Sequence, residues 1–187
     1  ILINDLKLII NAIDQNVKSE RRKTRDKAII LIGFSGGFRR SELVSINYED
    51  LDFVSEGVKI FIKRSKTDQS GEGMVKAIPY FDNKLFCPVL NLKNWLELSG
   101  IKIGKIFNIS DKNVSLIIKK YISLCGLDES KYSGHSLRSG FATSAAESGA
   151  EERNIMAMTG HKTAQMVRRY IQEANLFKNN ALNKIKI

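Results

Sequence analysis

The two histidines of the chain, His135 and His161, each follow a glycine in the C-terminal half of the sequence. Arg138 lies three positions after His135, so on a helix their side chains share one face and can converge on one small ligand. Histidine exchanges protons near neutral pH, and arginine offers a planar fork of donors to an anion. The motif also has a plain alternative, because His135 can cap a helix and His161 can occupy the turn that follows a glycine. A short motif of this kind needs support from its surroundings.

Three further patterns supply those surroundings. A Gly-Phe-Arg-Arg-Ser-Glu-Leu segment places Arg39 at a helix start, with Glu42 three residues later. Lys66, between a serine and a threonine, lies at the tip of an expected hairpin, and Tyr170 follows His161 by nine residues on an expected helix. In this order and spacing the motifs resemble those of the catalytic domain of the tyrosine recombinases, the phage integrase family. The resemblance runs over essentially the whole chain, from the first helix to Tyr170 and beyond.

The resemblance implies a role for each matching residue. It implies a catalytic set that consists of Arg39, Lys66, His135, Arg138, His161 and the nucleophile Tyr170, with Glu42 in support. Lys66 resembles the family's hairpin lysine, and its rivals in this part of the chain are Lys63, Arg64 and Lys76. Since every catalytic position holds its expected residue, the sequence predicts an active enzyme rather than a degenerate relative.

The chemistry of these residue types agrees with the resemblance. A tyrosyl oxygen that attacks a phosphodiester keeps the phosphorus as an ester, so strand exchange needs no ATP. Arg39 and Arg138 can neutralise the negative charge that builds on the nonbridging oxygens, as a metal ion does elsewhere. The leaving 5′ oxygen needs a proton, and Lys66 is the expected general acid. The sequence therefore predicts a reaction without cofactor or metal.

The histidines and Glu42 are less constrained by the sequence. His135 can accept the tyrosine proton or hydrogen-bond a phosphate oxygen, and both alternatives stay open. We expect His161 to hydrogen-bond the transition state. Glu42, one helical turn from Arg39, is expected to orient that arginine, and the alternative is an exposed ion pair on the helix surface.

The nucleophile must be chosen from five tyrosines, and the rivals of Tyr170 are Tyr48, Tyr80, Tyr121 and Tyr132. Tyr121 lies on an apolar helical stripe and Tyr80 ends a strand, so both are expected to be core or edge aromatics. Tyr170 shares a stripe with two apolar residues, which by itself favours burial. Its spacing from His161, and the two arginines beside it, favour Tyr170 as the nucleophile.

The elements that position these residues follow from the spacing of apolar side chains. Between Leu2 and Ile13, apolar residues recur at three- and four-residue spacing, which predicts a first helix. A second helix is predicted to end at the Gly36-Gly37 pair. A short third helix follows. The period then changes to two: Val58 to Ile62 and Met74 to Tyr80 are predicted to pair as a hairpin, with Asp50 to Val54 as the third strand.

Helical spacing returns at Pro88 and continues toward the end of the chain, where Gly149 and Gly160 divide it into short helices. The sequence contains no internal repeat and no long linker. The predicted fold class is α+β: mainly α-helical, with a small antiparallel three-stranded sheet. This is the catalytic core of the DNA breaking-rejoining enzymes that the motifs resemble.

The charge of the chain predicts a polyanionic partner, because 30 Lys and Arg residues against 20 Asp and Glu give a formal net charge of +10. The candidate contacts to double-stranded DNA are Arg40, Lys63, Arg64, Arg168 and Arg169. Two cysteines are too few for a disulfide framework or a multi-cysteine zinc site, and they favour a reducing compartment. The apolar runs are too short to span a bilayer. We therefore expect a cytoplasmic, nucleoid-associated protein without a membrane partner.

The predicted function is that of a site-specific DNA recombinase or integrase that acts through a covalent 3′-phosphotyrosine intermediate. The alternatives are strand cleavage like that of a type IB topoisomerase, and a DNA-binding module that performs no chemistry. Because the chain begins with Ile1 rather than Met, we expect residues 1–187 to be the catalytic domain of a longer protein, without the family's N-terminal DNA-clamping domain. The resemblance implies that residues 172–187 form an amphipathic tail that docks on a neighbouring protomer in a tetrameric synapse, and the alternative is a tail that folds back on its own domain.

Overall fold

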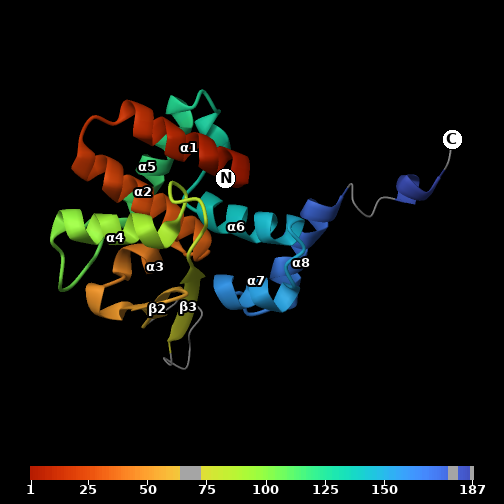
Figure 1. The fold of residues 1–187 in the computed structure, drawn as a ribbon. Coiled ribbons are helices and arrows are strands. Elements are labelled where there is room, and N and C mark those ends of the chain that lie inside the picture. The colour runs from red at the N-terminus through yellow and green to blue at the C-terminus, as the bar shows by residue number, and fades with distance from the viewer. Residues whose placement is uncertain (64–72, 177–180, 186–187) are drawn as a thin grey trace.

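The structure is a computed structural model that describes residues 1–63, 73–176 and 181–185 (Figure 1). Its α-helices are α1 (Ile3–Asn16), α2 (Glu20–Ser35), α3 (Arg40–Ser45), α4 (Pro88–Ser99), α5 (Asp111–Leu124), α6 (Ser136–Glu147), α7 (Glu152–Thr159) and α8 (Ala164–Asn175). The strands are β1 (Leu51–Val54), β2 (Gly57–Ile62) and β3 (Met74–Pro79). Short 3₁₀ helices occur at η1 (Tyr48–Asp50), η2 (Glu129–Lys131) and η3 (Ala181–Lys184).

Helix α2 is the centre of the helical body. Its residues from Ala28 to Ser35 are buried on every side, because α1, α4, α5 and α6 pack around it (Figure 1). Ser19 caps its first turn by accepting a hydrogen bond from the backbone of Arg22. A helix that is apolar on all faces belongs to the interior of a domain. The Gly36-Gly37 turn that ends α2 is consequently buried as well.

The sheet places one face against the helices. Its strand order is β1-β2-β3 with both pairs antiparallel, and Ile60 of β2 stands opposite Leu51 on one side and Lys76 on the other. Side chains at directly opposite positions point to the same face of a sheet. Because Ile60 and its neighbour Val58 are buried, Lys76 also points into the protein. The register of β3 thus brings a lysine into the interior.

Helices α6, α7 and α8 form a smaller packing unit at the side of the body (Figure 1). A separate apolar cluster joins them, in which Ala142 and Ala146 of α6 contact Ile155 of α7 and Val167 of α8. Small residues on α6 let the other two helices approach closely. Helix α7 ends at Gly160, whose φ of 63° is the left-handed conformation that glycine adopts most easily. This unit carries His161 and Tyr170.

The predicted fold class is confirmed: the helices and the three strands occur in the expected order. Within the described residues, no helix has the length and apolar character needed to cross a membrane. The segment after Tyr170 continues α8 to Asn175, and Ala181–Lys184 form a 3₁₀ helix, with Leu182 and Ile185 exposed. The predicted role of residues 172–187 stays a prediction.

Candidate active site

Arg39 enters the site from a turn that only glycine fits. Gly37 has a φ of 53°, and a Cβ atom at this position would lie 3.0 Å from the Phe141 ring and 3.2 Å from the Thr159 methyl group. The backbone then leaves the turn in an extended conformation, and Arg39 becomes the N-cap of α3. The turn therefore fixes the backbone position from which the Arg39 side chain extends.

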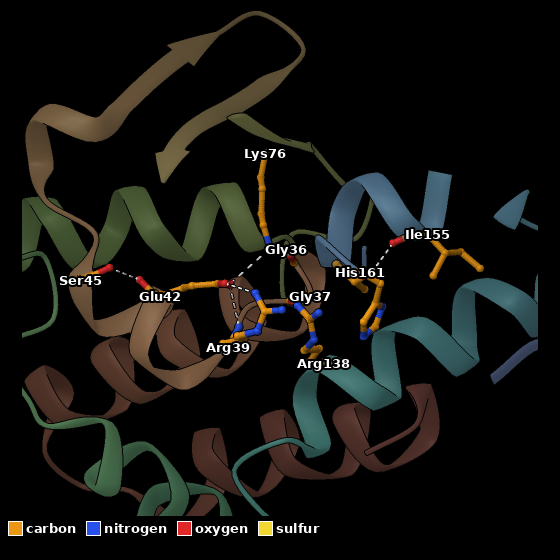
Figure 2. Close-up of polar contacts among 10 residues, drawn as sticks. Gly36, Gly37, Arg39, Glu42, Ser45, Lys76, Arg138, Ile155 and His161 are labelled. Atoms are coloured by element: carbon orange, nitrogen blue, oxygen red, sulfur yellow. Dashed lines mark hydrogen bonds and ion pairs between the residues drawn. The ribbon is translucent and has the colours of Figure 1, made fainter. Parts of the chain in front are cut away.

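Glu42 holds Arg39 at two points. One carboxylate oxygen accepts a hydrogen bond from the Arg39 backbone N–H at 3.0 Å, and the other accepts one from its guanidinium Nη1 at 2.5 Å (Figure 2). The Glu42 side chain is only 2% exposed. The Arg39 side chain is 16% exposed, so the pair is largely covered by the protein and is not an exposed ion pair on the helix surface. A buried carboxylate that binds the backbone and the side chain of one arginine restricts its rotamers.

Arg138 approaches from α6 and meets the same turn. It is 5% exposed, and its Nη1 donates a hydrogen bond to the carbonyl of Gly37 at 2.9 Å. Burial, reinforced by the nearby charge of Arg39, lowers the pKa of Arg138 to about 10. Its Nη2 atom is buried and has no hydrogen-bond partner among the described residues. A buried, positively charged donor without an acceptor is costly unless an anion satisfies it.

His161 is held by a hydroxyl that fixes its tautomer. The Thr159 hydroxyl lies 2.6 Å from the Ile155 carbonyl, to which it donates, and 2.7 Å from Nδ1 of His161 (Figure 2). A hydroxyl has one proton to give, so it accepts the second hydrogen bond from a protonated Nδ1. In the neutral ring, Nε2 then carries the free lone pair. Burial, followed by the charges of Arg138, Arg39 and Lys76, lowers the pKa of His161 to about 4, so the ring is neutral at pH 7.

Tyr170 is on α8, and its ring lies next to that of His161 in the segment between α7 and α8. The two ring centroids are 6.0 Å apart with an interplanar angle of 31°. Both residues line a pocket of about 450 Å³, together with Gln165, Met166, Arg169 and Glu173. The buried Val167 anchors this part of α8 to α6 and α7, so the half-buried tyrosine is directed by a packed helix. Tyr170 also contributes to the electrostatic surroundings of Arg138.

The other tyrosines are engaged elsewhere. The hydroxyl of the buried Tyr121 donates to Asp26 at 2.6 Å, and the hydroxyl of Tyr132 donates to Asp5 at 3.2 Å. Tyr80 accepts a hydrogen bond from Lys93 at 2.6 Å, and Tyr48 lies exposed on η1. These contacts are on other faces of the fold than the arginines.

The structure brings together some of the predicted site residues and leaves others apart. The charges of Arg39 and Arg138 act on His161, whose ring neighbours that of Tyr170, so these four residues lie in one region. His135 is exposed at the N-cap of α6, and among the described residues the hydrogen bonds and ion pairs of the arginines do not include it. Lys66 lies outside the described residues.

The candidate DNA contacts have different surroundings. Arg40 is half-buried and donates to Ser115 of α5 at 2.6 Å. Lys63 is exposed, and its ion pair with Asp50 at 2.8 Å raises its pKa. Arg168 pairs with Glu152 across α7 and α8, whereas Arg169 is exposed at the Tyr170 pocket. Arg64, like Lys66, lies outside the described residues.

Two residues near the arginines were not assigned a role from the sequence. Lys76 was considered only as a rival of Lys66, yet its ammonium reaches the Gly36 carbonyl beside Arg39. The signal that could have found it is the strand register, which places Lys76 opposite the buried Ile60. Thr159 lies two residues before His161, and this short spacing is the signal that could have pointed to its contact with the ring.

Metal ligands do not gather in the described part of the chain. Residues 1–63, 73–176 and 181–185 contain no group of three or more His, Cys, Asp or Glu side chains arranged to hold an ion. The positive charges of the site are supplied by side chains of α3, α6 and β3. The arrangement can bind an anion between two arginines, beside a neutral histidine and a tyrosine hydroxyl.

Comparison with known proteins gives one family. The model of the phage integrase family matches residues 3–176. An integrase/recombinase xerD homolog from Selenomonas ruminantium is 48% identical over 99% of this chain and 57% of its own length. The fold is similar to that of XerH recombinase bound to a palindromic difH substrate, with a TM-score of 0.74 and 20% identity over 96% of this chain and 53% of that chain. It is also similar to that of a lambda integrase tetramer bound to a Holliday junction, with a TM-score of 0.65 and 18% identity over 100% of this chain and 50% of that chain. The chain spans about half the length of these relatives.

Proposed function

The chain belongs to the phage integrase family, and on this premise we propose that it is the catalytic part of a site-specific DNA recombinase. Its proposed substrate is double-stranded DNA, which it cleaves and rejoins through a covalent 3′-phosphotyrosine. The net charge of +10 and the names of the similar proteins, which include recombinases bound to DNA, support this substrate.

The observation that carries the proposal is the unsatisfied donor of Arg138. Its Nη2 is buried without a partner among the described residues, beside a second arginine that Glu42 holds in place. A phosphodiester bears one negative charge on two nonbridging oxygens, which matches two guanidinium groups. As Tyr170 attacks, charge accumulates on those oxygens, and donors fixed beforehand stabilise it without reorganisation.

The proposed reaction has two bond changes and two proton transfers. The Tyr170 oxygen forms a bond to phosphorus, and the bond from phosphorus to the 5′ oxygen breaks. The tyrosine proton leaves as the ester forms. Its two candidate acceptors are Nε2 of His161 and the imidazole of His135. The 5′ oxygen takes a proton from Lys66, the general acid that the family resemblance implies. Rejoining is the reverse of these steps.

The remaining assignments concern the rest of the protein. We propose that Arg40, Lys63, Arg64, Arg168 and Arg169 contact DNA phosphates, which position a duplex without reading its sequence. Residues 172–187 are proposed as the segment that joins protomers in a tetrameric synapse, with the exposed Leu176, Leu182 and Ile185 as its apolar contacts. A separate DNA-clamping domain in the longer protein is part of this proposal.

Covalent trapping tests the function directly. The full-length protein is incubated with a library of nicked duplexes of randomised sequence, in which cleavage releases a short strand and traps the enzyme on DNA. We expect a denaturant-resistant adduct that forms in the presence of EDTA. Tyr170→Phe removes only the oxygen, so the adduct should disappear while DNA binding persists.

Tyr48→Phe is the matched control, because it removes an exposed hydroxyl away from the arginines. This variant should form the adduct at the normal rate. An adduct with Tyr170→Phe would show that another residue is the nucleophile. DNA binding without any adduct from the unaltered protein would favour the non-catalytic module, and relaxation of supercoiled DNA without strand exchange would favour the topoisomerase-like alternative.

A further inference from the structure

Lys76 is a charged residue in an apolar position. It lies in the middle of β3 opposite Ile60, on the face of the sheet that covers the core, and its side chain has no exposed area. Lysine is rarely buried to this degree unless its charge is paired. The surroundings of its ammonium group therefore indicate why it is there.

The ammonium contacts one short segment at three points. Nζ donates to the carbonyl of Gly36 at 2.8 Å and lies 3.8 Å from a carboxylate oxygen of Glu42 (Figure 2). It also lies 4.3 Å from the centre of the Phe38 ring. These three partners belong to the seven residues that surround Arg39 in the sequence. Lys76 thus ties the sheet to the backbone that presents Arg39.

The same turn binds Arg138 from the opposite direction. The Gly36 carbonyl accepts from Lys76, and the next carbonyl, that of Gly37, accepts from Arg138. Glu42 in turn receives Arg39 on one oxygen and faces Lys76 with the other. One cation on β3 is therefore connected to both arginines through a single turn and a single carboxylate.

The electrostatic cost of this arrangement argues against a purely stabilising role. Burial lowers the pKa of Lys76, the charge of Glu42 opposes this shift, and the charges of Arg138 and Arg39 add to it, so that the pKa is about 7. The folded state therefore disfavours the charged lysine compared with water. A buried ion pair is weak evidence for stability, because its replacement by apolar side chains of similar volume is often neutral or stabilising. Without Lys76 the Glu42 carboxylate would still have Arg39 as its partner, so its charge would not be left unpaired.

We propose that Lys76 is a positioning residue for DNA cleavage: it holds the Gly36–Glu42 segment so that Arg39 and Arg138 present their donors to the same phosphate. This inference rests on the proposed function. Lys76 acts through the turn and Glu42, and its own ammonium is directed at the Gly36 carbonyl rather than at the Tyr170 pocket.

The test compares Lys76→Met and Lys76→Arg with a matched control, Lys59→Met. Lys59 lies on the neighbouring strand, is 52% exposed and pairs with Asp52. Single-turnover adduct formation is measured on the duplex recovered by trapping, together with DNA affinity and the urea midpoint of unfolding. We expect Lys76→Met to slow cleavage about 10- to 100-fold, as the loss of an orienting contact does. Its DNA affinity should be unchanged, and its urea midpoint at pH 6 should be equal or higher.

Lys76→Arg, which can still donate to the Gly36 carbonyl, should recover most of the cleavage rate, and Lys59→Met should behave as the unaltered protein. Cleavage by Lys76→Met at the normal rate overturns the proposal. A lower urea midpoint in proportion to the lost activity also overturns it, because that result describes a structural residue.

A second measurement needs no DNA. NMR of the free protein reports exchange of the guanidinium protons of Arg39 and Arg138 with water, and Lys76→Met should accelerate it for both while Lys59→Met leaves it unchanged. Unchanged exchange in Lys76→Met contradicts the proposal. If the unaltered protein forms no adduct, the proposed function fails, and the NMR result still decides whether Lys76 positions the arginines.

Discussion

Arg39, Arg138 and His161 are each oriented by a contact with a buried group. Arg39 is held by Glu42, Arg138 by the Gly37 carbonyl, and His161 by Thr159, whose own hydroxyl is committed to the Ile155 carbonyl. These orienting groups are what allow two arginines to remain side by side in a buried location.

The His161 ring gives a prediction at the scale of single residues. We expect its NMR titration to have a midpoint near pH 4, with the neutral ring protonated on Nδ1. The chain has only two histidines, so the signals of His161 can be assigned by their loss in His161→Gln. Thr159→Val removes the acceptor and should move the proton toward Nε2. A ring that is already protonated on Nε2 in the unaltered protein would contradict the assignment.

The same lowered pKa has a defined effect on stability. Below pH 6.5 the unfolded chain binds a proton at this histidine that the folded chain does not bind until about pH 4. The free energy of unfolding should therefore decrease as the pH falls through this window, by at most about 1.4 kcal/mol per pH unit for one proton. Urea denaturation at several pH values measures this dependence. Between pH 6.5 and pH 4, the free energy of unfolding should fall less steeply with decreasing pH in His161→Gln than in the unaltered protein, by no more than this amount.

At the scale of elements, the Gly36-Gly37 turn decides where α2, α3 and α6 meet. Gly37, the left-handed residue of the turn, lies just after the buried end of α2. The two carbonyls of the turn accept hydrogen bonds from side chains of β3 and α6. The turn is therefore a junction of elements that lie far apart in the sequence.

Gly37→Ala tests this junction. The left-handed conformation costs a residue with a Cβ atom about 1–2 kcal/mol, and the new methyl group would press on Phe141 and Thr159. We expect a loss of stability of at least this size and a larger loss of cleavage, since Arg39 and Arg138 both depend on the turn. Chemical denaturation and covalent trapping measure the two effects.

Gly100→Ala is the matched control. Gly100 has a φ of 70°, and a Cβ atom there would meet nothing within 4 Å. This variant should carry the conformational cost alone and cleave at the normal rate. If Gly37→Ala behaved identically to Gly100→Ala, the turn would have no special part in presenting the arginines.

The periodicity of apolar residues was sufficient to predict most elements, because each helix buries a stripe and β2 alternates. The predicted arrangement of Arg39 with Glu42 also followed from local spacing on one helix. The position of Lys76 could not be predicted in this way, since it depends on strand register. Apolar periodicity also gives no information on the polar contact between Thr159 and His161, although the two residues are only two positions apart.

At the scale of the whole molecule, Tyr170, the proposed nucleophile, and the arginines belong to different packing units. Arg39 extends from the main core, whereas Tyr170 lies in the smaller cluster formed by α6, α7 and α8. Arg138 is on α6, the helix that both units share. Movement of α8 relative to α6 would therefore change the distance between Tyr170 and a phosphate bound by the arginines without disturbing the main core.

The end of the chain gives a prediction at this scale. Truncation before Leu176 should leave a folded protein that binds DNA, because α8 ends at Asn175, but cooperative assembly on DNA should be lost. The pair Leu182→Ala and Ile185→Ala, which keeps the full length, should weaken assembly in the same direction. Analytical ultracentrifugation with and without DNA measures both. Normal assembly of the truncated protein would exclude the tail as the link between protomers.

The acceptors for Lys76 and Arg138 are peptide carbonyls, which every amino acid carries. Changes of side chain at positions 36 and 37 can therefore displace these acceptors but never delete them. In related sequences, the feature that must be kept at these positions is the path of the backbone. Neighbouring side chains such as Phe141 and Thr159 restrict that path. A descendant of this protein could keep every charged residue of the site and still lose its activity through an uncharged substitution nearby.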